Sequence, residues 1–353
     1  MFLDIIKIFV PLTIAFLVGM AITPALADYL YRNKMWKKKN VPRAMDGHSA
    51  TITAKLHNDE ERKTPRMGGI VVWGSVLLTT LLFWMLAALF PTTATEKLSF
   101  LSRNQTWLPL FSLVVAALVG LVDDLLQVRE QGAGVGGGLS ATKRIVAVLF
   151  IGLVGALWFY LKLGVSTVSV PFLDPISLGF FFVPFFMIVM LALFSGGVID
   201  GLDGLSGGIF ASMFAAYSGI AFAQQQIDIA AFCAVVVGAV LAFLWYNIPP
   251  ARFFLSETGA LALTVTLAVV AFLTDAVLAL VIIAFPLWIT SASSIIQMLS
   301  KRFRGGRKVF LVAPLHHHFQ ALGWPATKVV MRYWIVGVVT SVAGMVVAIV
   351  GKL

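Results

Sequence analysis

Long apolar segments separated by polar loops dominate the chain. A segment of about 20 apolar residues can cross a bilayer as a helix. Only helices and closed barrels satisfy every backbone polar group in lipid, so the pattern predicts an all-α polytopic membrane protein with a single integral membrane domain, 1–353. The ten expected transmembrane helices are 5–27, 68–90, 107–122, 145–163, 176–195, 207–223, 229–246, 260–274, 276–299 and 329–350.

Basic residues concentrate in alternate loops. Of the 26 Lys and Arg residues, 21 lie in or beside the connections that follow the first, third, fifth, seventh and ninth segments. An excess of Lys and Arg marks cytoplasmic loops, so we expect these connections in the cytoplasm and both termini on the extracytoplasmic side. The expected cytoplasmic loops are approximately 31–66, 123–144, 196–206, 247–259 and 301–328.

Composition supports a membrane protein and narrows its chemistry. The chain is 59% hydrophobic and 12% charged, with a net charge of +10. Because the bases flank apolar segments, anionic lipid and topology explain them better than nucleic acid does. The lone Cys233 excludes an intramolecular disulfide and a cysteine metal cage. The segment 132–138 matches G-x-G-x-x-G, but it follows no soluble strand, so we expect a flexible linker there.

Carboxylates gather beside the membrane in three of the expected cytoplasmic loops. Asp123 and Asp124 end the third segment, Asp200 and Asp203 lie between the fifth and sixth, and Glu257 opens the eighth. Each could simply cap a helix, but carboxylates beside lipid are costly and usually serve an ion, a substrate or a proton path. Five together would repel one another, and oxygen ligands without thiolates favour Mg²⁺ or Mn²⁺ over zinc.

A run of histidines, His316-His317-His318, follows a strongly basic segment, 301–308. Three consecutive side chains cannot face one direction, so a zinc site built from them alone is not expected. Near neutral pH they can donate to phosphate oxygens or hold a carboxylate in place. Carboxylates, a divalent metal, histidines and cations at a membrane surface together indicate phosphoryl transfer between a soluble anion and a lipid.

Several motifs resemble the phospho-N-acetylmuramoyl-pentapeptide transferases, which belong to the polyprenyl-phosphate N-acetylhexosamine-1-phosphate transferases. The resemblance runs from about residue 40 to the end of the chain. The motifs that carry it, in order, are Thr64-Pro-Arg-Met-Gly-Gly69, Val122-Asp-Asp124, Asp200-Gly-Leu-Asp-Gly-Leu205, Phe254-Leu-Ser-Glu-Thr-Gly259, Ala313-Pro-Leu-His-His-His-Phe319 and Gly323-Trp-Pro325.

This resemblance implies a homodimer of ten-helix chains in the bacterial inner membrane, with Mg²⁺ and an active site that faces the cytoplasm. The phosphate of undecaprenyl phosphate would attack the β-phosphate of UDP-N-acetylmuramoyl-pentapeptide and release UMP. Asp123 and Asp124 would handle the lipid phosphate, with Asp123 as general base. Asp200 would act at the metal and the diphosphate, Asp203 would contact the nucleotide, and Phe254 would stack on uracil.

The remaining residue roles also follow from the resemblance. Glu257 takes the position of a metal-binding aspartate and would bind the metal with Asp200. His316, His317 and His318 would bind or orient phosphate groups, with His317 among the catalytic residues. Lys143, which follows the acid pair, would contact phosphate.

The chain departs from the family pattern at several of these contacts. Glu257 stands where an aspartate is usual, and Gln127 where a lysine follows the acid pair. Phe194 and Gly197 replace asparagines, and Arg66 replaces a small polar residue. These positions bear on the nucleotide, metal and diphosphate contacts. The loop 58–63, before the first motif, is also longer and more acidic than expected.

Three other functions stay open at this point. A sister transferase would move another UDP-N-acetylhexosamine 1-phosphate to the same lipid, and the donor from which UMP is released would distinguish it. A relative with a degenerate site could act as a non-catalytic membrane scaffold, although mutational loss of the site should not leave all the acids and histidines in place together. A transporter would require ionisable residues at mid-bilayer, and the expected helices contain almost none.

Overall fold

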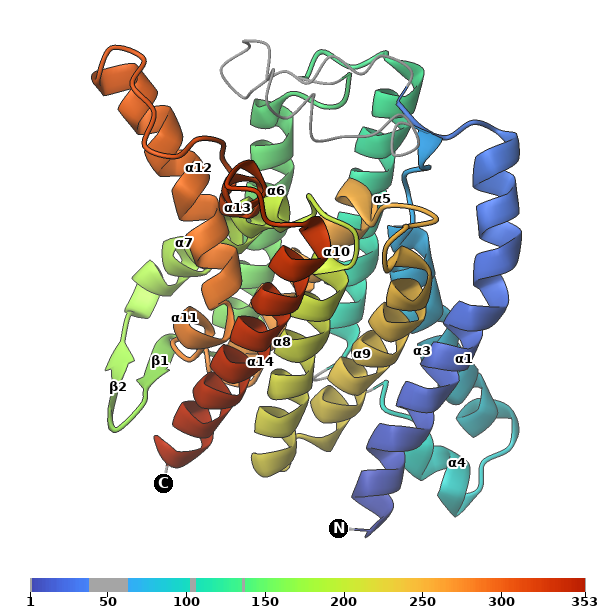
Figure 1. The fold of residues 1–353 in the computed structure, drawn as a ribbon. Helices are drawn as coiled ribbons and strands as arrows, with labels where there is room; N and C mark the ends of the chain where they lie inside the picture. The colour runs from blue at the N-terminus through green and yellow to red at the C-terminus, as the bar shows by residue number, and fades with distance from the viewer. Residues whose placement is uncertain (1, 38–62, 102–105, 135–136, 353) are drawn as a thin grey trace.

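The computed structural model describes residues 2–37, 63–101, 106–134 and 137–352, which are mostly helical. The long helices run side by side in one bundle, with both termini at one end and the connection between α12 and α13 at the other (Figure 1). Nine helices of the described residues are long and apolar enough to cross a membrane. They are α1 (Phe2–Arg32), α3 (Gly69–Leu89), α5 (Trp107–Arg129), α6 (Ala141–Leu157, continued by a π-helical turn Trp158–Lys162), α7 (Phe182–Ser195, extended by 3₁₀ turns on both sides to Gly179–Ile199), α8 (Leu205–Ala223), α9 (Ile227–Asn247), α10 (Ser256–Leu273) and α14 (Ala326–Val350).

The ninth expected helix, 276–299, is not one helix in the structure. The chain forms a single turn, α11 (Leu280–Ile283), and then α12 (Phe285–Phe303), with Pro286 in the first turn of α12. Proline lacks an amide donor and disfavours helical geometry in the preceding residue, which explains the break. One face of α12 buries hydroxyl and amide side chains, including Thr290 and Gln297. Together α11 and α12 lead the chain back toward the end opposite the termini.

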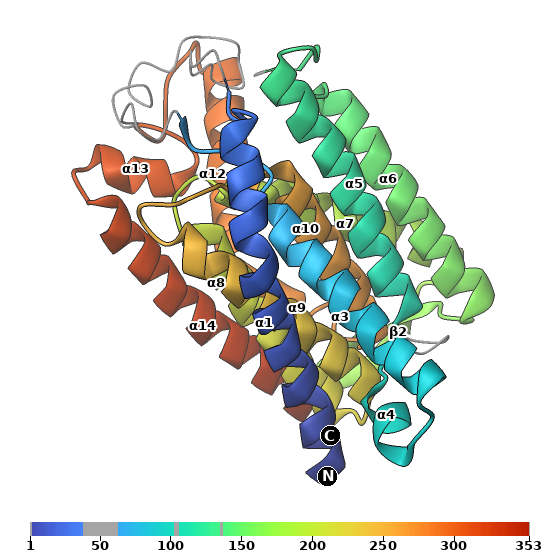
Figure 2. The same ribbon diagram turned by 90° about the vertical axis from the view of Figure 1, so that its right-hand side faces the viewer.

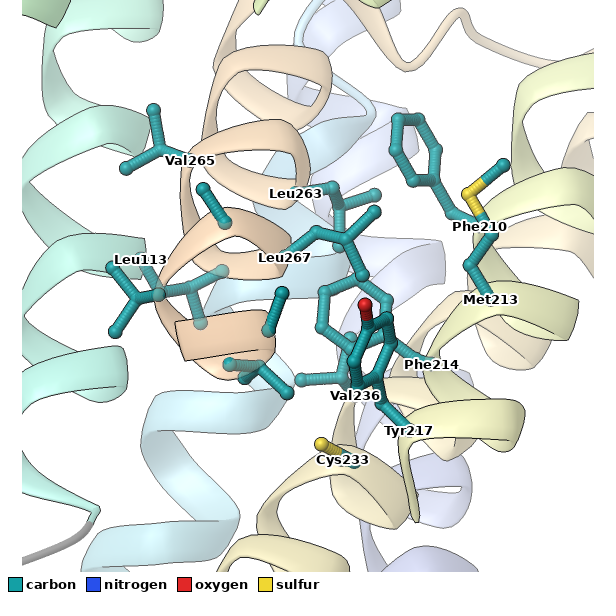
Figure 3. Packing of buried hydrophobic residues seen from close by; sticks show 14 of the residues in the cluster. Leu113, Phe210, Met213, Phe214, Tyr217, Cys233, Val236, Leu263, Val265 and Leu267 are labelled. Atoms are coloured by element: carbon teal, nitrogen blue, oxygen red, sulfur yellow. The ribbon is translucent and has the colours of Figure 1, made fainter. Parts of the chain in front are cut away.

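Two helices form the centre of the bundle. α9 and α10 bury most of their length, whereas α1 and α14 bury only a minor part of theirs. Figure 3 shows Phe214 and Tyr217 of α8 packed with Cys233 of α9 and Leu267 of α10 in the hydrophobic core. Small residues permit the closest helix crossings: a Cβ atom on Gly238 of α9 would lie 2.2 Å from the Leu12 carbonyl oxygen of α1. Such close backbone approach is the usual packing device in membranes.

An antiparallel hairpin at the end of the bundle that carries the termini was not predicted. Its strands are β1 (Thr167–Val170) and β2 (Leu173–Ser177), with Thr167 opposite Ser177. The Ser169 backbone and side chain both donate to the Asp275 carboxylate at the end of α10. Lys352 pairs with the same carboxylate at 3.4 Å. These contacts tie the hairpin to α10 and to the C-terminus.

The opposite end of the bundle carries the short helix α13 (Leu315–Ala321) and the first motif, at 64–69. Figure 2 shows α3, α5 and α10 adjacent to one another, and all three have an end here. Most of the long polar loop, residues 38–62, lies outside the described residues, so the acidic segment before the first motif is not placed. The short helix α4 (Thr93–Leu98) lies at the end that carries the termini (Figure 2).

Candidate active site

Three carboxylates from α5 and α10 come together at the end opposite the termini. Asp123 and Asp124 were expected in a loop, but α5 continues to Arg129 and holds both in its last two turns. Glu257 lies in the first turn of α10. Both aspartates are buried, and the amide nitrogens of Glu257 and Thr258 donate to the Asp124 carboxylate at 3.4 and 2.9 Å. The acid pair therefore lies directly against the N-terminus of α10.

Asp123 is enclosed by the glycine-rich segment that was expected to be a flexible linker. The Leu139 amide donates to Asp123 Oδ1, and Gln127 Nε2 donates to Oδ2 at 2.8 Å. A Cβ atom on Gly138 would lie 2.5 Å from Asp123 Oδ1, so only glycine lets the chain approach this closely. Backbone hydrogen bonds such as Gly132 N to Gly137 O (2.8 Å) hold the segment in a compact turn. The linker prediction was wrong for the residues described.

The basic side chain that reaches the acids from α6 is Arg144. Its Nη1 lies 2.8 Å from Glu257 Oε1 and 3.9 Å from Asp123 Oδ2, so one guanidinium lies between the two carboxylates. Lys143, the expected phosphate contact, is exposed. Its backbone amide donates to the side chain of Ser140, which caps α6. Consecutive residues on a helix point about 100° apart, so only one of the pair can face the acids.

Two further cations approach the same carboxylates and were not predicted as site residues. Arg66 Nε and Nη2 both lie 3.2 Å from Asp124 Oδ1. Lys37, after the end of α1, is half-buried, and its pKa is lowered to about 8 by burial and by the charge of Arg66, which outweigh the nearby carboxylates. Lys37 therefore carries most of a positive charge at pH 7.

Asp200 lies in the turn before α8 and contacts the start of α10. Its Oδ1 accepts from Ser206 Oγ at 2.7 Å, and its Oδ2 accepts from the Ser256 amide at 2.8 Å. The surrounding protein removes water from the carboxyl and raises its pKa, while the bonds from Ser206 and Ser256 act in the opposite direction. The acid motifs around Asp200 and Glu257 thus meet, as the sequence predicted.

Phe254 lies in the bend that follows α9, and Asp203, in the turn before α8, contacts this bend. Asp203 Oδ2 accepts from the Ala251 amide at 3.0 Å. Asn247, which sequence reasoning missed, joins two segments here: its Oδ1 accepts from the Gly204 amide and its Nδ2 donates to the Phe253 carbonyl, each at 2.9 Å. Phe253 is fully buried, whereas Phe254 is partly exposed.

Two of the three histidines face the loop that carries Asp200. A Cβ atom on Gly201 would lie 2.3 Å from His316 Nε2 and 3.2 Å from His317 Nε2. His317 Nδ1 is 2.7 Å from Gln320 Oε1. His316 is fully buried, and neither of its ring nitrogens has a hydrogen-bond partner among the residues described. Burial, together with the charge of His317, lowers the pKa of His316 well below its usual value, so its ring is neutral at pH 7.

His318 lies on another side of α13. Its Nδ1 accepts from the Leu311 amide at 3.2 Å, and its ring meets Phe310 edge-on at 5.5 Å. The helix separates it from its two neighbours, as expected for consecutive residues. His318 therefore holds the segment before α13, and the structure does not bring it to the Asp200 loop.

The donor atoms of this region fit a divalent cation only with help from a ligand. Within the described ranges, no group of three or more His, Cys, Asp and Glu side chains surrounds a common point. Ser256, the residue before Glu257, donates its amide to the Asp200 carboxylate, so Asp200 and Glu257 both lie at the first turn of α10. Mg²⁺ commonly takes one or two carboxylates and completes its shell with water and substrate phosphates. Two oxygen donors completed by a diphosphate fit that requirement.

Comparison with known protein families indicates the class to which this chain is similar. Residues 106–275, just under half of the chain, match the family model described as "Glycosyl transferase family 4", and they include in full six of the nine helices of the described residues that could cross a membrane.

The closer relationship is shown by curated relatives of nearly full length, all named phospho-N-acetylmuramoyl-pentapeptide-transferase. The protein of Geobacillus sp. (strain WCH70) is 35% identical and covers 95% of this chain and 96% of its own length. That of Geobacillus kaustophilus is 33% identical over 97% and 98%, and that of Listeria monocytogenes serotype 4b (strain CLIP80459) is 32% identical over 84% and 87%. The chain belongs to the phospho-N-acetylmuramoyl-pentapeptide transferase family, and the resemblance stated from its motifs is confirmed.

Proposed function

We propose that this protein transfers phospho-N-acetylmuramoyl-pentapeptide from its UDP-linked donor to undecaprenyl phosphate. The products are UMP and the first lipid-linked peptidoglycan precursor. One observation carries the proposal beyond family membership: Asp123, Glu257 and Asp200 meet His316 and His317 at one end of a membrane bundle. A membrane-embedded site is required because one substrate is a lipid and the other is soluble.

The reaction is a displacement at phosphorus. An oxygen of the lipid phosphate forms a bond to the β-phosphorus of the donor, and the bond from that phosphorus to the bridging oxygen breaks, so that UMP leaves with the bridging oxygen. Asp123 accepts the proton of the lipid phosphate, which increases the nucleophilicity of the attacking oxygen. Arg144 lies beside Asp123 and offers a cation to the charge on the phosphoryl oxygens.

The nucleotide and diphosphate contacts are assigned to the opposite side of the cluster. We place uracil on the partly exposed ring of Phe254 and the nucleotide beside Asp203. His316 and His317 donate to the diphosphate, because the ring nitrogens of the buried His316 have no hydrogen-bond partner among the described residues. The exposed Lys143 remains available for phosphate when substrate is bound. We propose that His318 does not contact phosphate itself, and that it holds the segment before α13, which carries His316 and His317.

Magnesium is proposed as the cofactor, with Asp200 and Glu257 as its protein ligands. When bound, it would neutralise the diphosphate and stabilise the charge that develops on the leaving oxygen. We also propose that the chain crosses the membrane ten times, with α11 and α12 as the ninth crossing, both termini outside, and the site facing the cytoplasm of a bacterial inner membrane. A homodimer is part of the same proposal.

The testing experiment measures UMP release by the full-length protein in detergent. The donor is either UDP-N-acetylmuramoyl-pentapeptide or UDP-N-acetylglucosamine, with a polyprenyl phosphate acceptor. We expect turnover with the muramoyl donor in Mg²⁺ or Mn²⁺, none in Zn²⁺, and loss of turnover in excess chelator. Turnover with the N-acetylglucosamine donor alone would assign the chain to a sister transferase. Undiminished turnover in chelator would reject the metal.

The histidines give a separate prediction. Replacing His317 by alanine is expected to lower turnover by about 10²-fold or more, because a donor to the diphosphate is lost. The matched control is His318→Ala, whose ring lies on another side of α13 and whose loss should affect stability more than rate. Metal analysis of the purified wild type should find no stoichiometric zinc. One tightly held zinc per chain would overturn the assignment of these histidines to phosphate.

A further inference from the structure

Asp124 accepts more contacts from the surrounding protein than its neighbour Asp123 does. Its side chain has no solvent exposure. Oδ1 accepts from Arg66 Nε and Nη2, both at 3.2 Å, and from the Glu257 amide at 3.4 Å, while Oδ2 accepts from the Thr258 amide at 2.9 Å. A carboxylate offers about four lone-pair positions. At Asp124 a guanidinium and one amide share Oδ1, and a second amide binds Oδ2, so both oxygens already have protein partners.

The two amides belong to the N-terminal turn of α10. The first amides of a helix lack intrahelical acceptors and attract an anion. Here that anion comes from α5. The two helices touch through their backbones, because a Cβ atom on Gly120 would lie 2.3 Å from the Glu257 carbonyl oxygen. Thr258 Oγ1 also donates to the Ala117 carbonyl at 2.9 Å. Asp124 thus adds to the contacts that join the end of α5 to the start of α10.

Arg66 is held in place by backbone hydrogen bonds on two sides. Its amide donates to the Met35 carbonyl at 2.8 Å. On the other side, the Phe254 amide donates to the Pro65 carbonyl at 2.9 Å, and the Gly68 amide donates to the Phe254 carbonyl at 2.8 Å. The guanidinium is mostly buried, with 18% of its side chain exposed. A long side chain fixed at its base loses little additional entropy when it binds Asp124.

The start of α10 in turn determines where two reactive carboxylates lie. Ser256 has φ = +59°, a conformation that a residue with a Cβ atom rarely adopts. Surrounding contacts must maintain such a residue. Its amide donates to Asp200 at 2.8 Å, and the next two amides donate to Asp124. Loss of the Asp124 contacts would free this turn and with it both Glu257 and Asp200.

We infer that Arg66 and Asp124 form a positioning pair, in which Arg66 fixes Asp124 and Asp124 fixes the N-terminus of α10, so that Asp123 alone of the acid pair acts on the lipid phosphate. The inference rests on the proposed function for its reaction, but its structural part does not. It assigns to Arg66 a role in the site, and it gives Asp124 a positioning role in place of the expected contact with the lipid phosphate.

The test compares Arg66→Gln, Asp124→Asn and the double variant in the full-length enzyme. Loss of a residue that orients a reactive group typically costs about 10–100-fold, so each single variant should lower kcat by that factor. Because the two act as a unit, the double variant should be no slower than the slower single variant. Arg66→Lys should recover part of the rate. The controls are Arg32→Gln and Asp28→Asn, which break an exposed Arg–Asp pair in α1 with the same substitutions.

The pH–rate profile distinguishes positioning from proton transfer. Under our inference, Asp124→Asn lowers the profile but keeps its acidic limb, because Asp123 still supplies the base. If Asp124 were the general base, the residual rate of Asp124→Asn would lose that limb. Loss of the limb, or a native rate in Arg66→Gln with a loss above about 10³-fold in Asp124→Asn, would overturn the inference.

A readout without substrate separates this inference from the proposed function. Hydrogen exchange at the Glu257 and Thr258 amides should accelerate in both single variants and stay unchanged in the Arg32 and Asp28 controls. If wild-type enzyme does not use the muramoyl donor but exchange responds in this way, the donor assignment fails and the positioning pair stands. Unchanged exchange in well-folded Arg66→Gln and Asp124→Asn protein would refute the pair itself.

Discussion

Replacing Asp123 by asparagine is expected to lower the rate of UMP release by about 10²–10⁴-fold, the usual range for loss of a positioned acid–base group. Asparagine keeps the shape of the side chain but cannot accept the proton of the lipid phosphate. The measurement is steady-state release of UMP in detergent, with saturating donor, polyprenyl phosphate and Mg²⁺. A near-native rate would contradict the assignment of Asp123 as general base.

Folding must be measured beside the rate, because Asp123 is buried and both of its oxygens accept hydrogen bonds. An asparagine would turn its amide group toward one of these donors, at a cost of about 1–3 kcal/mol in the free energy of unfolding. Gln127→Leu is the matched control, since it removes one of the same bonds and keeps the carboxylate. Asp275→Asn, at the other end of the bundle, controls for the substitution itself. We expect Asp275→Asn to keep the rate, and Gln127→Leu to lose less of it than Asp123→Asn, because the carboxylate remains.

The length of the apolar segments predicted most of the fold, because most helices here are apolar around much of their circumference. The prediction of a single helix over 276–299 was wrong. The segment's apolar residues gave the right length, but Pro286 and the polar side chains that follow divide the segment and bury a hydroxyl-rich face. The hairpin Thr167–Ser177 was missed because its two strands are too short to show alternation, and Pro175 interrupts the second. Its stability comes from Asp275, which is distant in sequence.

The acids and two of the histidines could be found from the sequence because each motif places them beside an apolar segment. The basic residues that pair with these acids could not be found in this way. Arg66 and Asp124 are 58 residues apart, and Arg144 and Glu257 are 113 apart. No local pattern indicates such pairs. The choice between Lys143 and Arg144 depended on which face of α6 meets α5, and this orientation is set by tertiary packing. The glycine-rich segment had a usable signal, since Gly138 is required for close approach to Asp123.

Glu257 gives the second large effect that we expect. Its carboxylate contacts Arg144 at 2.8 Å and is partly exposed, while Asp124 supplies the anion that binds the first amides of α10. Glu257 is therefore not needed as the helix cap, a role worth only about 0.3–1 kcal/mol. As a metal ligand it should be far more important. We expect Glu257→Gln and Glu257→Ala to lose about 10²-fold or more in turnover.

The aspartate variant tests the same role from the other direction. Glu257→Asp shortens the side chain by one carbon–carbon bond, about 1.5 Å. Magnesium tolerates little error in its 2.0–2.1 Å bonds but is often held through a bridging water. The variant should therefore keep activity, with a changed Mg²⁺ optimum.

Arg144→Gln separates metal binding from the ion pair, because it removes the partner of Glu257 and leaves the carboxylate in place. If Glu257 binds Mg²⁺, Glu257→Gln shifts the midpoint of a Mg²⁺ titration to higher concentration. Arg144→Gln, in contrast, leaves the midpoint unchanged or lowers it, since a competing cation has been removed. Titration of Mn²⁺ binding with the donor present but without the lipid acceptor gives the same comparison independently of turnover. Equal midpoints for the wild type and Glu257→Gln would mean that Glu257 serves the ion pair and not the metal.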